Sequence, residues 1–173
     1  MDVSNKYKLT NETIVFEGRL LHRIQALKAF GNVKKREVGG YVESEDNLSQ
    51  KGACWISDEA KVFDGACVIN NAQVVGYARV YNAAIIGDNA RVSGESVVRR
   101  NARVFGNAIV GENAEISGEA KVYGQAIIRH RAHVYGDAEV YENAKVSGNV
   151  RVLGMVKVRG MSLVTDDATV RVS

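Results

Sequence analysis

The sequence predicts an all-β fold: a parallel β-helix built from six-residue repeats behind a short N-terminal capping segment. Every sixth residue from Ile56 to Val170 is Val or Ile, at all twenty positions. The column two places earlier, counted in steps of six from residue 48 to 168, is Ala at fifteen of twenty-one positions. The column two places later, from residue 52 to 172, is Gly, Asp or Asn at sixteen of twenty-one. The 173 residues include no proline, a residue that would remove a backbone N–H from a sheet ladder.

Each six-residue unit predicts one short strand and one corner. Side chains alternate along a strand, so the Ala and the Val or Ile two residues later point the same way and line an interior. The Gly, Asp or Asn that follows tolerates the sharp turn, with positive φ, that a corner needs. An amphipathic helix would need a period of 3.6 residues, which this region lacks.

Units such as Ile86-Gly87-Asp88-Asn89-Ala90 and Val110-Gly111-Glu112-Asn113-Ala114 resemble the hexapeptide repeat of single-stranded left-handed parallel β-helices, whose three-sided coils take eighteen residues. The left hand and the triangular coil are what this resemblance implies. Twenty units then form about seven coils, and a strand spacing of ~4.8 Å makes the prism about 32 Å long. We expect the β-helix to occupy residues 48–173, without a cap at its C-terminal end.

Residues 1–47 lack the repeat and are expected to cap the first coil. Lys6–Leu9 and Thr13–Phe16 are typical of strands, and Glu17-Gly18 is placed to turn the chain into a partner strand at Leu20–Ile24. This pattern predicts a small hairpin. The spacing of apolar residues between Leu20 and Phe30 equally suits a short amphipathic helix, so the sequence leaves both alternatives open.

Composition bounds the class of function. A hydrophobic fraction of 46% excludes a disordered chain, and a formal net charge of +3 is too small to indicate nucleic acid or membrane by itself. The chain shows neither a signal-peptide layout nor an apolar run of membrane-spanning length, so we expect a cytoplasmic protein. Cys54 and Cys67 match no zinc spacing and are expected to be reduced thiols. We expect no cofactor and no metal.

A more specific resemblance lies where the two regions meet. Gly39-Gly40-Tyr41-Val42 is followed by Glu43–Gln50, by Cys54-Trp55, and then by repeated Ala-x-Val units. This arrangement resembles the YdcK-type β-solenoid proteins of bacteria and their phages over essentially the whole chain. The resemblance implies the trimeric LpxA-like structural class, which includes many acyltransferases, and a compact phage or prophage version. It implies no reaction and no catalytic residue.

The enzyme alternative is a trimeric hexapeptide acyltransferase that uses acyl-CoA. Such enzymes resemble one another in a catalytic His and a loop projecting from one coil, whereas the repeat frame here contains no insertion. His133, at an outward strand position, is the catalytic candidate, and His130 lies at a corner. Neither has an orienting carboxylate in its own unit, and a general base needs that geometry. A three-His zinc site lacks a third ligand, because His22 lies outside the prism.

Outward strand positions flanking the Val/Ile column hold twelve basic residues against two acids, Glu115 and Glu139. Stacking by eighteen residues gathers one basic face with interleaved aromatics: Lys61, Arg79, Arg99, Arg151 and Arg171 with Phe63, Tyr81, His133 and Tyr135. This face suits an anion, a nucleotide or a nucleic-acid backbone. Alternatively, its long side chains simply cover the sheet and pair with corner acids.

Two corners, Arg99-Arg100 and Arg129-His130-Arg131, break the turn rule with bulky charge, and departures from a local rule are where function is expected. Counting by eighteen places Arg100 and His130 on different edges. The candidate anion- or partner-binding residues are therefore Arg79, Tyr81, Arg99, Arg100, Arg129, His130 and Arg131.

The two other faces carry apolar rows. One stacks Phe105, Tyr123 and Tyr141, and the other places Ile109 over Ile127 with Leu163 two coils further on. These six residues are the candidate interface, since apolar stripes on a flat sheet often mark partner surfaces. The alternative is that such ladders only stabilise stacked coils. Trp55 and Tyr41 are expected to tie the cap to the first coil.

These observations favour a non-enzymatic cytoplasmic scaffold of phage or prophage origin. We expect it to form a dimer or trimer and to bind a protein partner, for example as an inhibitor of a host protein or defence system. Acyl-CoA transfer is the first alternative, and nucleotide or nucleic-acid binding through the basic face is the second.

Overall fold

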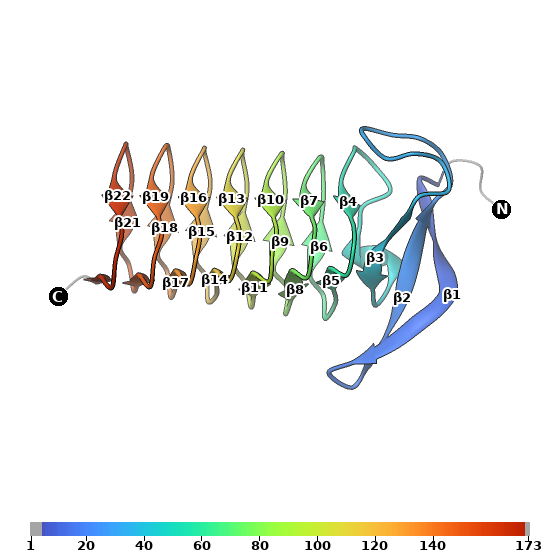
Figure 1. The fold of residues 1–173 in the computed structure, drawn as a ribbon, viewed down its shortest axis with the longest axis horizontal. Helices are drawn as coiled ribbons and strands as arrows, with labels where there is room; N and C mark the ends of the chain where they lie inside the picture. The colour runs from blue at the N-terminus through green and yellow to red at the C-terminus, as the bar shows by residue number, and fades with distance from the viewer. Residues whose placement is uncertain (1–4, 172–173) are drawn as a thin grey trace.

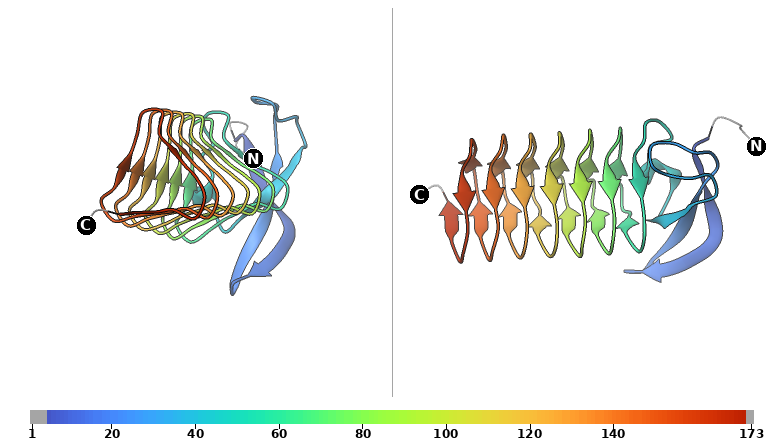
Figure 2. Two further views of the ribbon diagram at one scale, coloured as in Figure 1. Left: turned by 60° about the vertical axis from the view of Figure 1, so that its left-hand side comes forward. Right: turned by 45° about the horizontal axis from the view of Figure 1, so that its top comes forward.

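The computed structural model describes residues 5–171 as a three-sided parallel β-solenoid with an antiparallel cap at its N-terminal end (Figure 1). The predicted β-helix architecture is confirmed. Successive turns stack along one axis, and the cap hairpin projects sideways from the end of the prism (Figure 2). Within residues 5–171, no helix has the length and apolar character needed to cross a membrane.

The cap consists of three strands and one helical turn. β1 (Tyr7–Phe16) and β2 (Arg19–Ala26) form an antiparallel hairpin, and both turn residues, Glu17 and Gly18, have positive φ. β3 (Val38–Val42) pairs antiparallel with β2 and parallel with β5 (Lys61–Val62) of the first coil, and the 3-10 helix η1 (Glu45–Asn47) follows. The cap therefore extends one face of the prism into a ten-stranded sheet.

The hairpin prediction is confirmed, and the helix alternative for the Leu20–Phe30 stretch is wrong. Leu21 packs on one side of β2 against Tyr41 and Phe63, whereas Ile24 and Ala26 face the solenoid core on the other side. The three-residue step from Leu21 to Ile24 mimics helical spacing because both faces of this strand are covered.

The prism has three parallel sheets whose strands pair in register with residues eighteen positions away. β5 is followed on the ten-stranded sheet by β8 (Arg79–Tyr81), β11 (Val97–Arg99), β14 (Glu115–Ile116), β17 (His133–Tyr135), β20 (Arg151–Leu153) and β23 (Thr169–Arg171). The seven-stranded sheet contains β4 (Trp55–Ile56), β7 (Gln73–Val74), β10 (Arg91–Val92), β13 (Ile109–Val110), β16 (Ile127–Ile128), β19 (Lys145–Val146) and β22 (Leu163–Val164). The six-stranded sheet contains β6 (Cys67–Val68), β9 (Ile85–Ile86), β12 (Arg103–Val104), β15 (Lys121–Val122), β18 (Glu139–Val140) and β21 (Lys157–Val158).

The core is the interior of the prism. The Val/Ile column is fully buried from Ile56 to Val152, and the Ala column is buried beside it. Toward the last described coil this changes, because Val164, Ala168 and Val170 are only partly buried. The repeat thus builds one continuous hydrophobic core whose C-terminal end is open within the described residues.

Acidic corner residues have a structural role that the repeat pattern alone did not reveal. Asp58 and Asp88 each accept a hydrogen bond at 3.0 Å from the backbone N–H eighteen residues later, donated by Gly76 and Gly106. Glu142 accepts likewise from Gly160 at 2.7 Å. Each of these acids has positive φ, so one residue both turns the corner and ties it to the next coil.

The N-terminal end of the prism is closed by polar side chains of the cap. The first coil has no preceding coil to bond its carbonyl groups, and unpaired buried carbonyls are costly. Lys6 is 1% exposed, and its Nζ donates to the carbonyl of Cys54 at 3.0 Å. Tyr7 donates its hydroxyl proton to the carbonyl of Leu48 at 2.7 Å. Burial lowers the pKa of Lys6 and raises that of Tyr7.

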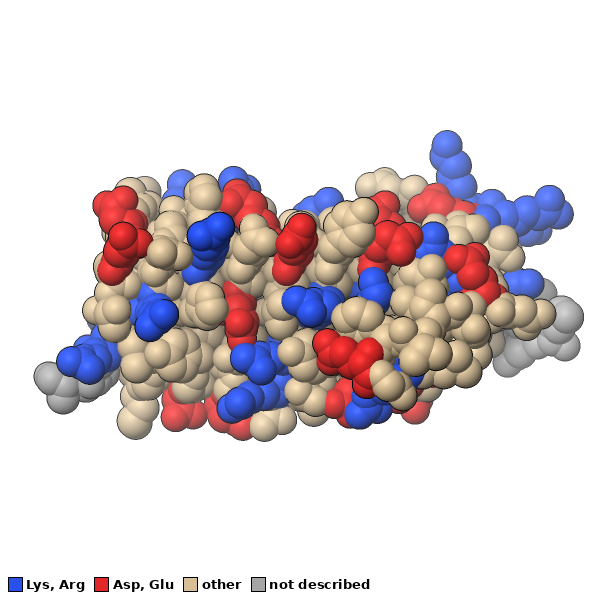
Figure 3. Space-filling model, turned by 60° about the horizontal axis from the view of Figure 1, so that its bottom comes forward, with Lys and Arg blue, Asp and Glu red and all other residues tan. Residues whose placement is uncertain are grey.

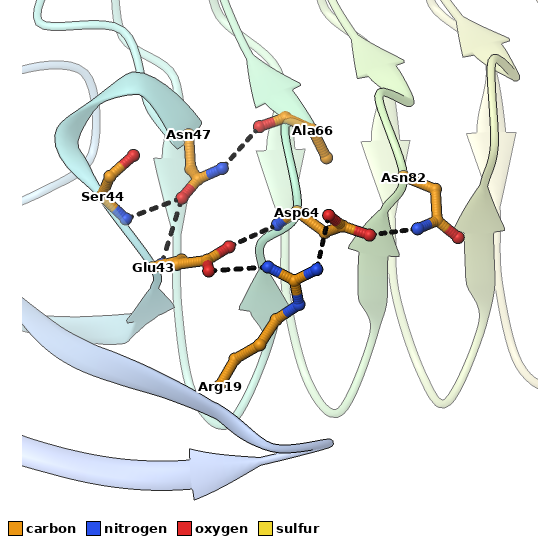
Figure 4. A network of polar contacts seen from close by, with 7 residues as sticks. All are labelled: Arg19, Glu43, Ser44, Asn47, Asp64, Ala66 and Asn82. Carbon is orange, nitrogen blue, oxygen red and sulfur yellow. Dashed lines mark hydrogen bonds and ion pairs between the residues drawn. The ribbon is translucent and has the colours of Figure 1, made fainter.

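A second set of contacts joins η1 and the hairpin to the first coil (Figure 4). Arg19 bridges Glu43 at 2.8 Å and Asp64 at 2.7 Å, and Glu43 also accepts from the backbone N–H of Asp64. Asn47 is 2% exposed, accepts from the N–H groups of Glu43 (3.1 Å) and Ser44 (2.9 Å), and donates to the carbonyl of Ala66 at 2.8 Å.

Asn47→Ala is expected to lower the free energy of unfolding by about 3 kcal/mol, because it removes three hydrogen bonds and leaves the Ser44 N–H and the Ala66 carbonyl without the partner that the side chain supplies. Denaturant unfolding followed by circular dichroism measures this. Asn71→Ala is the matched control: Asn71 is exposed, and it bonds the N–H of Ala53 and the Asn89 side chain at another corner. Equal losses in the two variants would contradict the role assigned to Asn47.

Candidate functional site

The candidate site is the outer face of the ten-stranded sheet, where each coil contributes two outward side chains around its buried Val or Ile. One row is Lys61, Arg79, Val97, Glu115, His133, Arg151 and Thr169. The other row is Phe63, Tyr81, Arg99, Ser117, Tyr135, Leu153 and Arg171. The sheet register therefore brings together the basic and aromatic residues that counting by eighteen placed on one face.

Glu115 occupies the middle of this face and contacts basic groups from both neighbouring coils. Its Oε1 accepts from Arg99 Nε at 2.7 Å, and its Oε2 lies 3.7 Å from His133 Nδ1. The hydrogen bond that Arg99 donates to Glu115 raises the pKa of Arg99. Arg79 lies 3.9 Å from Glu17 of the cap hairpin. The acids that pair with Arg99 and Arg79 are therefore a strand residue and a cap residue, rather than the corner acids.

Charge on this side of the molecule is mixed in sign. Figure 3 brings the underside of Figure 1 forward and shows Lys and Arg separated by Asp, Glu and uncharged residues. On the six-stranded sheet, Glu139 lies 3.9 Å from the Nζ atoms of both Lys121 and Lys157. Glu115 and Glu139, the two acidic residues among the outward strand positions, therefore each lie beside two basic side chains and partly neutralise their charge.

Both solenoid histidines have a carboxylate partner, which comes from the preceding coil. His133 faces Glu115, and His130 Nε2 lies 3.5 Å from Glu112 Oε2, which also accepts the His130 backbone N–H at 3.1 Å. The sequence-based prediction considered only carboxylates within each histidine's own six-residue unit and so did not identify these partners. Each partner is the residue eighteen positions before the histidine, which lies beside it on the preceding coil. Both imidazoles are about half exposed.

Two shallow hollows lie along this face. One, of about 280 Å³, is lined by Arg131, His133, Asn149, Arg151, Asp167 and Thr169. The other, of about 520 Å³, shares His133 and Arg151 and extends to Arg99, Arg100, Ser117, Tyr135 and two glycines. His130 and Glu112 line a third hollow, which adjoins the first and shares Arg131, Asn149 and Asp167 with it. Arg100 and His130 are not brought together, and Arg129 is exposed directly after β16 of the seven-stranded sheet.

The six-stranded sheet carries the aromatic row. The rings of Tyr123 and Tyr141 stack with centroids 4.9 Å apart, and Tyr123 donates to Glu139 Oε2 at 3.0 Å. Burial and that bond raise the pKa of Tyr123 to about 12. Phe105 lies over Gly87, where a Cβ atom would stand 2.6 Å from its ring. The row is therefore packed onto its own coils.

The seven-stranded sheet carries the apolar stripe, which we define as Ile109, Ile127, Met161 and Leu163. Ile109 and Ile127 are register neighbours, and Lys145 stands between Ile127 and Leu163. Met161 is 90% and Leu163 67% exposed. Met161, Leu163 and Ile127 line a hollow of about 470 Å³. The stripe therefore offers apolar surface that its own coils leave uncovered.

Trp55 and Tyr41 lie at the junction of cap and solenoid. Trp55 is 2% exposed and makes edge contacts with Phe30 and Tyr7, at centroid distances of 5.5 and 6.4 Å. Tyr41 packs under the guanidinium of Arg23, 4.5 Å from ring centroid to Cζ. Both cysteines are free, Cys54 buried and Cys67 half-buried. Among residues 5–171, no group of three or more His, Cys, Asp or Glu side chains is arranged to hold a metal ion.

No family model matches the chain. Among curated proteins, it is similar to the uncharacterized acetyltransferase YdcK of Escherichia coli strain K12, with 34% identity over 80 residues. The match covers 41% of this chain and 24% of the relative, so it spans about a quarter of the relative's length. The hexapeptide frame and the stacked parallel sheets show that the chain is a hexapeptide-repeat β-solenoid, and the match shows that part of it is similar to YdcK.

Proposed function

We propose that this chain is a non-enzymatic scaffold that associates with itself and binds a protein partner. The observation that carries the proposal is the apolar stripe on the seven-stranded sheet. Exposed apolar side chains gathered on a flat, polar-rimmed surface are typical of partner surfaces, and a flexible Met adapts to varied partners. A phage or prophage origin and a host protein as target belong to the same proposal and rest on the family resemblance. A cytoplasmic location also belongs to it and rests on the absence of a signal-peptide pattern in the sequence.

Self-association rests on the same apolar stripe. A second copy presents the same row of Ile109 and Ile127 in register, so two stripes can cover each other. A dimer or trimer is therefore the form we expect.

Ile109→Glu combined with Ile127→Glu is expected to weaken association, because it places two charges on the stripe without touching the core. Light scattering over a concentration series measures the mass, and recovery of a partner from host lysate measures binding. The control combines Ile69→Glu with Ile85→Glu, which are half-buried outward residues on the six-stranded side. A parent chain that stays monomeric when concentrated would contradict self-association, and partner recovery unchanged by the stripe variant would contradict partner binding through the stripe.

A trimeric acyltransferase is the second candidate. It is favoured by the name of the relative and by the His133–Glu115 pair, since a carboxylate that orients an imidazole is what a general base needs. Turnover of acetyl-CoA separates the two functions. The scaffold predicts no release of free CoA when acetyl-CoA is supplied with an amine acceptor, whereas an acyltransferase predicts CoA release that His133→Ala abolishes.

A further inference from the structure

One rung of the stacking ladder on the ten-stranded sheet is missing. The rungs are the outward residues that follow the buried column, one per coil, and Phe63 and Tyr81 stack there with centroids 5.0 Å apart and planes 5° apart. Arg99 is the next rung, in register with Tyr81. Ser117 follows, and Tyr135 continues the ladder one coil later. Ser117 is the smallest side chain in this row and leaves the space between Arg99 and Tyr135 unfilled.

The gap has the thickness of one planar ring. Rings on adjacent coils of this protein stack at 4.9 and 5.0 Å, so Arg99 and Tyr135, two coils apart, are separated by about 10 Å. A flat group placed midway would contact both at ordinary stacking distance. The corner beside the gap is also open, because Gly118 and Gly136 carry no side chain there. These residues line the hollow of about 520 Å³.

The two walls of the gap differ in chemistry. The Arg99 guanidinium is held in place by Glu115, with Nε to Oε1 at 2.7 Å. A held, planar guanidinium stacks well on heteroaromatic rings, and the opposite wall is the Tyr135 ring. Arg100, Arg151 and His133 line the same hollow. Only Glu115 opposes them there, so the hollow favours a ligand that carries negative charge.

We propose that this gap, the Ser117 slot, binds a mononucleotide, with the base between Arg99 and Tyr135 and the phosphate among Arg100 and Arg151. A neutral ring would leave the guanidinium groups unused, and a simple anion would leave the stacking walls unused. A nucleotide uses both. The proposal goes beyond the scaffold function and involves a different sheet from the apolar stripe, so either can fail without the other.

Calorimetric titration with adenosine 5′-monophosphate tests the slot, using adenosine and ribose 5-phosphate as probes that each lack one half of the ligand. We expect saturable binding of the monophosphate and binding about tenfold weaker for each half. Absence of binding at millimolar monophosphate, or equal binding of ribose 5-phosphate, would overturn the proposal. A ten-nucleotide single-stranded DNA that binds more tightly than the monophosphate would overturn the assignment to a mononucleotide.

Ser117→Tyr fills the missing rung and is expected to abolish binding while the unfolding midpoint stays equal or rises, since the new ring can stack on Tyr135. Ser147→Tyr is the matched control, because Ser147 is also half-buried and followed by glycine but belongs to the seven-stranded side. Tyr135→Ala removes one wall and is expected to weaken binding about tenfold. Parent-like binding by a folded Ser117→Tyr variant would show that the ligand lies elsewhere.

Discussion

Val98→Glu is expected to abolish the folded protein. Val98 is fully buried in the interior of β11, where a carboxylate would have neither water nor a basic partner. Burying an unpaired charge costs more than about 5 kcal/mol, which matches the whole stability of many domains. Because each coil is the template for the next, the defect would also interrupt stacking in both directions.

Val97→Glu is the matched control, one residue away on the same strand. Val97 points outward, in register with Arg79 and Glu115, so one attraction and one repulsion nearly cancel in solvent. We expect a shift within about 1 kcal/mol. Far-ultraviolet circular dichroism and size-exclusion chromatography distinguish the outcomes. Similar behaviour of the two variants would contradict the assignment of inward and outward faces.

Gly39→Ala is expected to detach the cap from the solenoid. A Cβ atom at Gly39 would stand 2.5 Å from the carbonyl oxygen of Ile56 and 2.6 Å from both Ile24 Cγ1 and Trp55 Cζ2. The first of these atoms belongs to the backbone and the other two belong to side chains packed in the core. None of them can move aside easily, so β3 itself would have to shift. Overpacking of this kind costs about 3 kcal/mol.

Gly111→Ala controls for the loss of a glycine in itself. Its added Cβ atom would meet Ser93 Oγ at 3.3 Å, and a serine hydroxyl can rotate away. Urea unfolding should therefore separate the two variants by at least about 2 kcal/mol. Proteolysis in the linker after β2 should also become faster in Gly39→Ala alone. Equal stability would mean that the Gly39-Gly40 pair has another role.

The structure of the cap could be predicted only in part from the sequence. Alternation and the Glu17-Gly18 turn predict the hairpin, but the Leu20–Phe30 stretch remained ambiguous. Leu21 and Ile24 are both buried, on opposite sides of β2, and no local pattern reports that both sides of a strand are covered. The sequence likewise gives no signal that the ammonium of Lys6 is buried against the Cys54 carbonyl.

The candidate site on the ten-stranded sheet could likewise be predicted only in part. The rows of the ten-stranded face follow from counting by eighteen, so the basic and aromatic residues could be gathered before any coordinates. The pairing of Arg99 and His133 with Glu115 depends on side-chain direction between coils. The gap at Ser117 could not be predicted from the sequence. A small side chain there leaves a gap only because larger side chains, Arg99 and Tyr135, occupy the same row on the coils before and after it.

From the sequence alone one can predict the β-solenoid architecture, the eighteen-residue register between coils and the side chains that point inward. The reason is that a strict six-residue period has one consistent way to bury its Val, Ile and Ala side chains. The tertiary structure alone decided how the cap sits on the first coil, which acids satisfy which bases, and where the outer surface is hollow. Those features depend on contacts between residues from different coils or from the cap, and a period describes only the contacts that repeat.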